Sequence, residues 1–162
     1  MFMVNQSYKG EKEILSNLDK YFIFRTSWLY SEYGNNFMKT MLRLAETRNK
    51  ISIVSDQIGT PTYAKDLAEV ILQVILERNN FYGIYHYSNE GVASWYDFAK
   101  AIFELENLEV KTTPPIKSEA YTTLAKRPVF SVFDKMKIKK SFSIEIPFWR
   151  DSLKVAVANI KL

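Results

Sequence analysis

Two short polar stretches, residues 25–28 and 56–62, carry side chains suited to ligand binding. Each stretch follows an apolar run typical of a β-strand. The first ends on Trp28, whose indole offers a flat apolar face and an N–H donor. Because open α/β sheets bind ligands beyond the carboxyl ends of their strands, the two stretches predict a binding site without identifying its ligand.

Residues suited to nucleophilic or metal chemistry are scarce. The chain has no cysteine, which excludes disulfides, thiolate nucleophiles and Cys-ligated metals. His86 is the single histidine and lies in the apolar run 84–87, with no second ligand or catalytic partner beside it in the sequence. We therefore predict a structural role for His86 and no metal site.

Strand and helix patterns alternate along the chain. Apolar runs rich in strand-forming residues predict strands at 21–24, 51–54, 84–87 and 108–111. Apolar residues at helical spacing predict helices over 11–18, 37–45, 67–75, 98–105 and 147–160. This alternation predicts an α/β fold whose sheet is at least partly parallel, in one domain spanning residues 1–162.

Polar side chains mark the starts of three of these helices. Asn35 or Asn36 can accept hydrogen bonds from the free amides of a first turn, and Ser94 with Asp97 resembles a capping box. Thr62 is predicted to cap the next helix, with an inner face of Leu67, Val70, Ile71, Val74 and Ile75.

Composition indicates a globular protein with 47% hydrophobic and 25% charged residues. The net charge of +4 includes a cluster at Lys135, Lys137, Lys139 and Lys140, which we interpret as a solvated face near a turn. No nucleic-acid-binding motif accompanies it, so we expect no nucleic-acid partner. The sequence also has no apolar run of the ~18–20 residues that cross a bilayer and no signal-peptide pattern, so we expect a cytoplasmic protein.

Five stretches, in order, resemble the dTDP-4-dehydrorhamnose reductase family. They are FRTSWLY at 24–30, GNNFMKTML at 34–42, DQIGTPT at 56–62, GIYH at 83–86, and residues 121–128 with Arg127-Pro128. The resemblance implies the C-terminal, substrate-binding part of an extended short-chain dehydrogenase fold, a few strands alternating with helices, without the N-terminal Rossmann half. Family members use NADPH or NADH to reduce the 4-keto group of a dTDP-activated 6-deoxy sugar.

The catalytic features of that family are missing here. The five glycines form no G-x-x-G-x-x-G turn for a cofactor. The family's Gly-Glu step corresponds to Gly10-Glu11, which aligns Met3 with the catalytic Tyr and Ser7 with the Lys. Tyr8 and Lys12 have Tyr-x-x-x-Lys spacing and would share a helix face, so they are the alternative pair. The resemblance implies that residues 1–18 are a remnant of the helix that follows the family's catalytic Tyr-x-x-x-Lys position.

The resemblance also implies roles for binding residues. Trp28 is expected against the sugar ring, with core packing as the alternative, and Arg127 is expected to clamp the diphosphate. Thr26 and Ser27 would approach the nicotinamide end of a cofactor or cap the strand end. The remaining expected substrate contacts are Asn36 (alternatively a helix cap), Gln57, Gly59 and Thr62. Some relatives bind Mg through carboxylates, one of which aligns with Lys65, so no metal is expected.

Two functions follow as hypotheses. The first is a partial dTDP-4-dehydrorhamnose reductase that supplies the site for a dTDP-sugar and, alone, binds no cofactor and is inactive. Its partners would be the missing half or a second copy of itself. The second is a non-catalytic interaction or regulatory module on the same scaffold.

Overall fold

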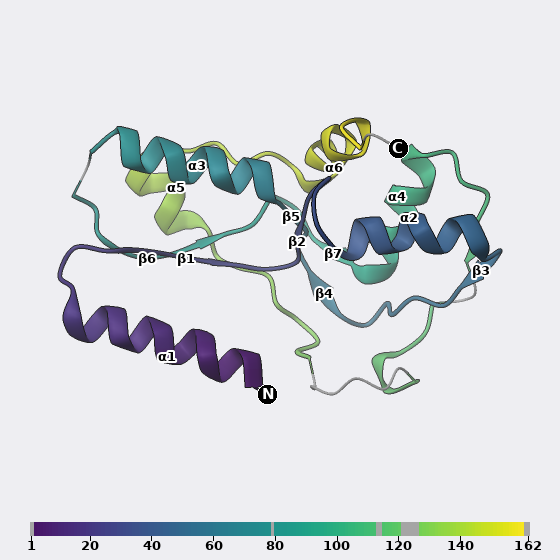
Figure 1. The fold of residues 1–162 in the computed structure, drawn as a ribbon, viewed down its shortest axis with the longest axis horizontal. Helices are drawn as coiled ribbons and strands as arrows, with labels where there is room; N and C mark the ends of the chain where they lie inside the picture. Colours follow the sequence, from purple (N-terminus) through teal and green to yellow (C-terminus); the bar gives the residue numbers. More distant parts are fainter. Residues whose placement is uncertain (1, 79, 113–114, 121–126, 161–162) are drawn as a thin grey trace.

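Alternating helices and short strands build the computed structural model, which describes residues 2–78, 80–112, 115–120 and 127–160 (Figure 1). The helices are α1 (Phe2–Asn17), α2 (Phe37–Thr47), α3 (Ala64–Leu76), α4 (Trp95–Leu105), α5 (Met136–Phe142) and α6 (Trp149–Ala158), with a 3-10 turn at Ser118–Ala120. The strands are β1 (Phe22–Thr26), β2 (Leu29–Tyr30), β3 (Lys50–Ile51), β4 (Ile58–Gly59), β5 (Thr62–Tyr63), β6 (Gly83–Tyr87), β7 (Ala93–Ser94) and β8 (Lys111–Thr112).

The strands pair two by two. Strands β1 and β6, β2 and β5, and β3 and β8 are parallel, whereas β4 and β7 are antiparallel. In each parallel pair, at least one helix lies between the two strands along the chain, as a parallel connection requires. The prediction of a partly parallel α/β fold is therefore confirmed.

One hydrophobic cluster lies on the β1–β6 sheet. Tyr85 and Tyr87 of β6 pack against Val70 and Val74 of α3 and against Ile138 of α5. Figure 1 shows α3 and α5 on one side of this sheet and α1 on the other. Helix α1 is tied to β1 by an ion pair of 2.6 Å between Glu11 and Arg25.

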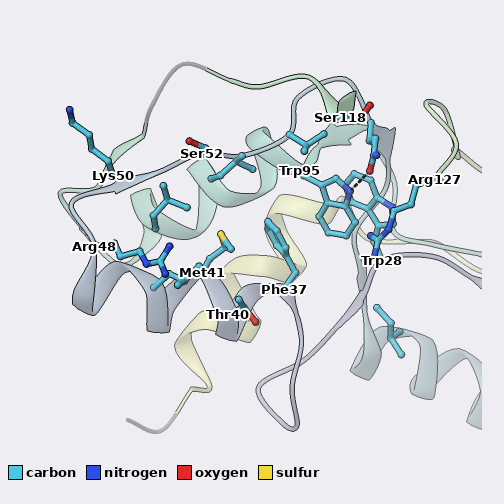
Figure 2. Close-up of a pocket in the computed structure, with 16 residues that line it drawn as sticks. Trp28, Phe37, Thr40, Met41, Arg48, Lys50, Ser52, Trp95, Ser118 and Arg127 are labelled. Atoms are coloured by element: carbon cyan, nitrogen blue, oxygen red, sulfur yellow. Dashed lines mark hydrogen bonds between the residues drawn. The ribbon is translucent and has the colours of Figure 1, made fainter. Parts of the chain in front are cut away.

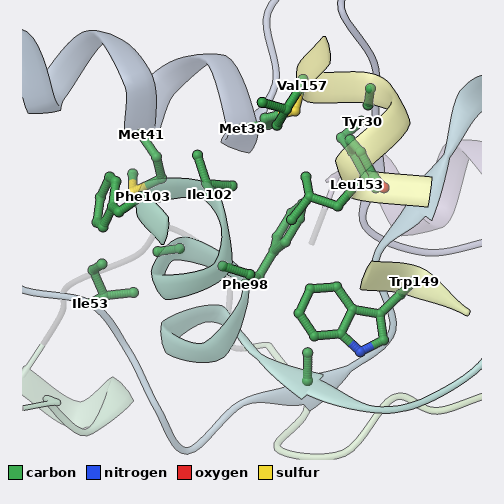
Figure 3. Packing of buried hydrophobic residues seen from close by; sticks show 14 of the residues in the cluster. Tyr30, Met38, Met41, Ile53, Phe98, Ile102, Phe103, Trp149, Leu153 and Val157 are labelled. Carbon is green, nitrogen blue, oxygen red and sulfur yellow. The ribbon is translucent and has the colours of Figure 1, made fainter. Parts of the chain in front are cut away.

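A second cluster joins α2, α4 and α6 (Figure 3). Phe98 and Ile102 of α4 are fully buried between Met38 of α2 and Leu153 of α6. Asn36 begins α2, because its side-chain oxygen accepts from the Lys39 amide at 3.2 Å, which confirms the predicted cap. The capping box at the start of α4 is also confirmed.

The buried side chain of Asn89 connects the two clusters. Its amide group donates to Asp66 of α3 at 2.6 Å and to Ser152 of α6 at 2.8 Å. Its oxygen accepts from the Tyr63 amide at 2.8 Å, and Lys135 donates to the Asn89 carbonyl at 2.9 Å. A fully buried amide that makes these bonds fixes the loop after β6 against β5.

The structure corrects several predictions. Thr62 does not cap α3: the helix begins at Ala64, and Thr62 belongs to β5 because its hydroxyl donates to the Ser27 carbonyl. Ile75 is 63% exposed instead of facing the core. The strand expected over 108–111 is displaced to Lys111–Thr112, and that expected over 51–54 is reduced to Lys50–Ile51 with an isolated bridge at Val54.

Only part of the lysine cluster forms the solvated face that was predicted: Lys137 and Lys140 are exposed, whereas Lys135 is buried. Lys137, Lys139 and Lys140 belong to α5, a helix that was not predicted, and Lys135 directly precedes it. Lys135 is only 8% exposed and pairs with Glu90 at 3.1 Å, while Lys139 pairs with the same carboxylate at 2.5 Å. Lys137 donates to the Ile84 carbonyl at 2.9 Å. None of the described helices is long and apolar enough to cross a membrane.

Candidate ligand-binding pocket

The two predicted polar stretches meet in the structure. The Thr62 amide donates to the Trp28 carbonyl at 3.1 Å, and the Thr62 hydroxyl donates to the Ser27 carbonyl at 2.6 Å. In return, the Ser27 hydroxyl donates to the Thr60 carbonyl at 3.3 Å. These hydrogen bonds join the chain after β1 to the chain after β4, so both stretches border one site.

Trp28 is held in an unusual backbone conformation. Its φ angle of 50° lies in the left-handed region, which costs a non-glycine residue roughly 1–2 kcal/mol. Gly59 leaves room for the indole, because a Cβ at Gly59 would lie 2.7 Å from Trp28 Cε2. Strain of this kind persists where the surroundings fix it, and it is frequent at functional sites.

Trp95, the first residue of α4, lies at the centre of the predicted ligand residues. Its indole stacks on that of Trp28, with ring centroids 3.6 Å apart and ring planes 10° from parallel. Its Nε1 donates to Gln57 Oε1 at 3.2 Å, and the Arg127 guanidinium carbon lies 5.9 Å from its ring centroid. Phe37 contacts it from α2, at a centroid distance of 4.6 Å.

Trp95 is not among the residues that the sequence predicts to bind a ligand. One feature of the sequence pointed to it: an aromatic residue directly follows the Ser94 cap, where a strand gives way to a helix. The two polar stretches at 25–28 and 56–62 also follow predicted strands. The capping box fixes where α4 begins, and the Tyr96 amide donates to the Val54 carbonyl at 3.0 Å. Both interactions hold the Trp95 backbone beside the pocket.

These residues form one end of a pocket of about 700 Å³ (Figure 2). The lining includes the apolar residues Phe37, Met41, Leu44, Ile53 and Val54, and Figure 2 shows Phe37 and Met41 in the middle of the pocket. Arg48 and Lys50 lie at the end opposite Trp28 and Arg127 in Figure 2. A volume of several hundred Å³ with an apolar wall and a few polar groups is typical of small-molecule sites.

The structure separates the predicted substrate residues into two groups. Trp28, Gln57 and Arg127 line the pocket, and Gly59 lies against the Trp28 indole. Thr62 is fully buried and is absent from the lining.

Asn36 also stands apart from the pocket. Its NH2 group donates to the Ser31 and Tyr33 carbonyls, and its oxygen caps α2. A ligand contact by Asn36 or Thr62 stays a prediction, and the hydrogen bonds give both residues a positioning role. The stretch 121–126, part of the fifth motif, lies outside the described residues.

The pocket offers binding groups and little acid–base chemistry. Among the lining residues of the described chain there is no Asp, Glu, His, Tyr or Cys. Burial raises the pKa of the Tyr30 and Tyr87 hydroxyls, but neither lines the pocket. Within the described residues, no cluster of three acidic, His or Cys side chains is placed to hold a metal.

The residues considered for catalysis lie on α1. Met3 and Ser7 fall within this helix, and Ser7 is exposed. Tyr8 and Lys12 share a face as predicted, with the Lys12 ammonium 4.7 Å from the Tyr8 ring centroid. Ser7, Tyr8 and Lys12 do not line the described pocket. Of the two residues considered for a cofactor, Thr26 has a buried hydroxyl that makes no hydrogen bond.

Comparison with known proteins identifies relatives over almost the whole chain. The RmlD substrate binding domain matches residues 5–162. A dTDP-4-dehydrorhamnose reductase of Aggregatibacter actinomycetemcomitans is 45% identical over 157 residues, which cover 90% of this chain and 53% of that protein. The spore coat polysaccharide biosynthesis protein SpsK of Bacillus subtilis (strain 168) is 42% identical, over 90% of this chain and 50% of that protein. The chain thus spans about half the length of these curated relatives.

Solved structures confirm the partial extended short-chain dehydrogenase fold. The dTDP-4-dehydrorhamnose reductase of Bacillus anthracis str. Ames, in complex with NADP, matches with a TM-score of 0.88 and 42% identity, covering 95% of this chain and 53% of that chain. A UDP-N-acetylglucosamine 4-epimerase from Bacillus cereus matches with a TM-score of 0.67 at 15% identity, which shows the fold alone. The chain belongs to the RmlD substrate-binding-domain family.

Proposed function

We propose that this chain supplies the sugar-nucleotide site of a dTDP-4-dehydrorhamnose reductase. The observation that carries the proposal is the pocket itself, which combines stacked indoles, an arginine and an apolar middle. Relatives of 42–45% identity that are named for this reaction or for polysaccharide synthesis support it. Indole faces pack against the C–H groups of sugars, and a guanidinium binds phosphate through paired hydrogen bonds.

A dTDP-sugar would lie along the pocket with its diphosphate near Arg127 and its sugar near Trp28. The apolar middle, which includes Phe37 and Met41, would receive the thymine ring. Burial of an apolar base contributes about 25 cal/mol for each Å² removed from water. This arrangement assigns the charged, the apolar and the aromatic parts of the ligand to matching parts of the pocket.

The hydride donor and the proton donor are proposed to come from outside this chain. Its five glycines form no dinucleotide-binding turn, so the residues present do not fit a complete NADPH site. Thr26 and Ser27 would border a cofactor that is held elsewhere. We therefore infer that the isolated chain binds the sugar nucleotide and does not reduce it.

Calorimetric titration with dTDP-L-rhamnose tests the proposal. We expect saturable binding that is weakened at least about tenfold by Arg127→Ala, because hydrogen bonds to a charged group contribute about 1.5–3 kcal/mol. Arg150→Ala is the matched control, since Arg150 pairs with Glu104 and does not line the pocket. Absence of binding at millimolar ligand would contradict the proposal. Adding the cofactor-binding half of a related reductase and following NADPH oxidation would then test whether the two parts form an active enzyme.

A non-catalytic interaction module is the second candidate, because one surface offers apolar groups for association. Helix α1 exposes Tyr8 and Leu15, and Leu18 follows directly after the helix; each of the three is at least 44% exposed. Among the described strands, β1 pairs only with β6, so its other edge can accept a strand. Light scattering after size-exclusion chromatography separates the two candidates: a monomer that binds dTDP-L-rhamnose favours the first, and a stable oligomer without ligand binding favours the second.

A further inference from the structure

The carboxamide of Gln57 has a defined orientation, with its oxygen atom toward the Trp95 indole. An indole N–H can only donate, so the Gln57 atom 3.2 Å from Trp95 Nε1 is the acceptor Oε1 (Figure 2, dashed line). The amide is planar, and its NH2 group therefore points away from the indole. No described residue accepts a hydrogen bond from this NH2 group, although Gln57 lines the pocket.

The backbone around Gln57 is anchored on both sides. The Asp56 carboxylate accepts from the Ser118 amide at 2.9 and 3.0 Å and from the Ser118 hydroxyl at 2.9 Å. The Ile58 amide donates to the Val129 carbonyl at 2.7 Å. A side chain between two fixed neighbours loses little further freedom when it binds a ligand, which favours affinity.

The Gln57 NH2 group and the Arg127 guanidinium are both donors beside the same indole. Arg127 lies 5.9 Å from the Trp95 ring centroid, and Trp95 contacts Gln57 directly. The nearby Asp56 carboxylate is already occupied by Ser118. This end of the pocket therefore presents donors to its ligand, and phosphate oxygens, which only accept, are the groups that match it.

We propose that Gln57 donates a hydrogen bond from its NH2 group to a phosphate oxygen of the ligand, and that Trp95 is the positioning residue that fixes the carboxamide in this orientation. The inference rests on the proposed function, because it takes the ligand to be a nucleoside diphosphate. Beyond the proposed function, the inference specifies which atom of Gln57 binds the ligand, which part of the ligand that atom contacts, and why Trp95 is required.

The Gln57→Glu variant tests this directly. Glutamate keeps an acceptor for the Trp95 N–H and replaces the NH2 donor by a charged oxygen that repels phosphate. We expect dTDP to bind at least about tenfold more weakly, as for a lost hydrogen bond to a charged group. Thymidine, which lacks phosphates, should bind equally to both proteins. Asn80→Asp, an exposed change in the turn before β6, is the control for added charge and should alter dTDP affinity less than about twofold.

The Trp95→Phe variant tests the positioning role. Phenylalanine keeps an aromatic ring but removes the N–H, so the Gln57 carboxamide can rotate and dTDP affinity should fall. In the Gln57→Glu background the same change should have a smaller effect, because the group that Trp95 positions is already lost. Equal effects of Trp95→Phe in both backgrounds would overturn the positioning role.

The outcomes distinguish failure of the inference from failure of the proposed function. If the unaltered chain does not bind dTDP, the proposed function is wrong. If it binds dTDP and Gln57→Glu binds within twofold, only the inference is wrong. An NMR titration of the unaltered, ¹⁵N-labelled chain avoids any folding defect of the variants: the Gln57 NH2 signals must shift on saturation with dTDP and remain unchanged with thymidine, and immobile signals with dTDP overturn the inference.

Discussion

Adding a single methyl group at Gly59 should disturb the pocket through Trp28. A Cβ at this position would lie 2.7 Å from Cε2 and 2.9 Å from Cζ2 of the Trp28 indole, and 2.9 Å from the Ser131 hydroxyl. The indole cannot simply retreat, because its face is stacked on Trp95 at a centroid distance of 3.6 Å. In Gly59→Ala, the Trp28 side chain must therefore rotate or the loop after β4 must move.

The size of the effect follows from two opposing contributions. Overpacking of a buried site costs about 1–3 kcal/mol, whereas replacing Gly by Ala restricts the unfolded chain and returns about 0.4–1 kcal/mol. We expect a net loss of about 1–2 kcal/mol in the free energy of unfolding, measured by urea denaturation. Gly10→Ala is the control: nothing lies within 4 Å of its Cβ, and Gly10 is inside α1, so it should stabilise the helix by about 0.5–1 kcal/mol.

A spectroscopic measurement shows whether Trp28 itself moves. Two stacked indoles couple their excited states and give a paired band in the ultraviolet circular-dichroism spectrum. We expect this band to be lost in Trp95→Phe and diminished in Gly59→Ala, together with a weaker affinity for dTDP. If Gly59→Ala keeps the stability, the band and the affinity of the unaltered chain, the close approach of Gly59 and Trp28 does not determine the pocket.

The remaining predictions concern the framework that supports the pocket. Asn89→Ala should cost about 2–3 kcal/mol in urea denaturation, because it leaves the buried Tyr63 amide without its acceptor; a change below ~0.5 kcal/mol would contradict this. Burial alone would raise the pKa of Glu90, but hydrogen bonds from Lys139 and Lys135 outweigh it and lower that pKa. Its contribution to stability is therefore present above pH 4.5 and is lost as the pH falls through the lowered pKa, so Glu90→Gln should show a flatter acid profile in thermal melts at successive pH values. If the melting temperature of Glu90→Gln falls with decreasing pH as steeply as that of the unaltered chain, the ion pairs of Glu90 do not contribute to stability.

Local sequence patterns predicted the features that local interactions determine. Asn36 caps α2 and Ser94 forms a box with Asp97 because each interaction spans three residues. Thr62 was assigned a similar cap, but its hydroxyl bonds to Ser27, which is 35 residues away in the chain. The Thr62 hydroxyl therefore binds a distant carbonyl instead of the start of α3, and the local sequence does not reveal which of these two partners it takes.

The binding residues follow the same distinction. Trp28, Gln57 and Arg127 were expected from family motifs and do line one pocket. Trp95 was missed because its importance comes from a stack with Trp28 that brings together distant segments. The basic cluster is solvated only in part, because Lys135 and Lys139 bind the carboxylate of Glu90, a pairing that charge counting along the chain does not show.

The most direct test uses the three tryptophans as reporters in an NMR titration with dTDP-L-rhamnose. Trp28 and Trp95 line the pocket, whereas Trp149, the first residue of α6, is 4% exposed in the core and serves as the internal reference. The account predicts that the indole N–H signals of Trp28 and Trp95 shift in a saturable way while that of Trp149 stays in place. Unchanged Trp28 and Trp95 signals at millimolar ligand would contradict the assignment of this pocket as a sugar-nucleotide site.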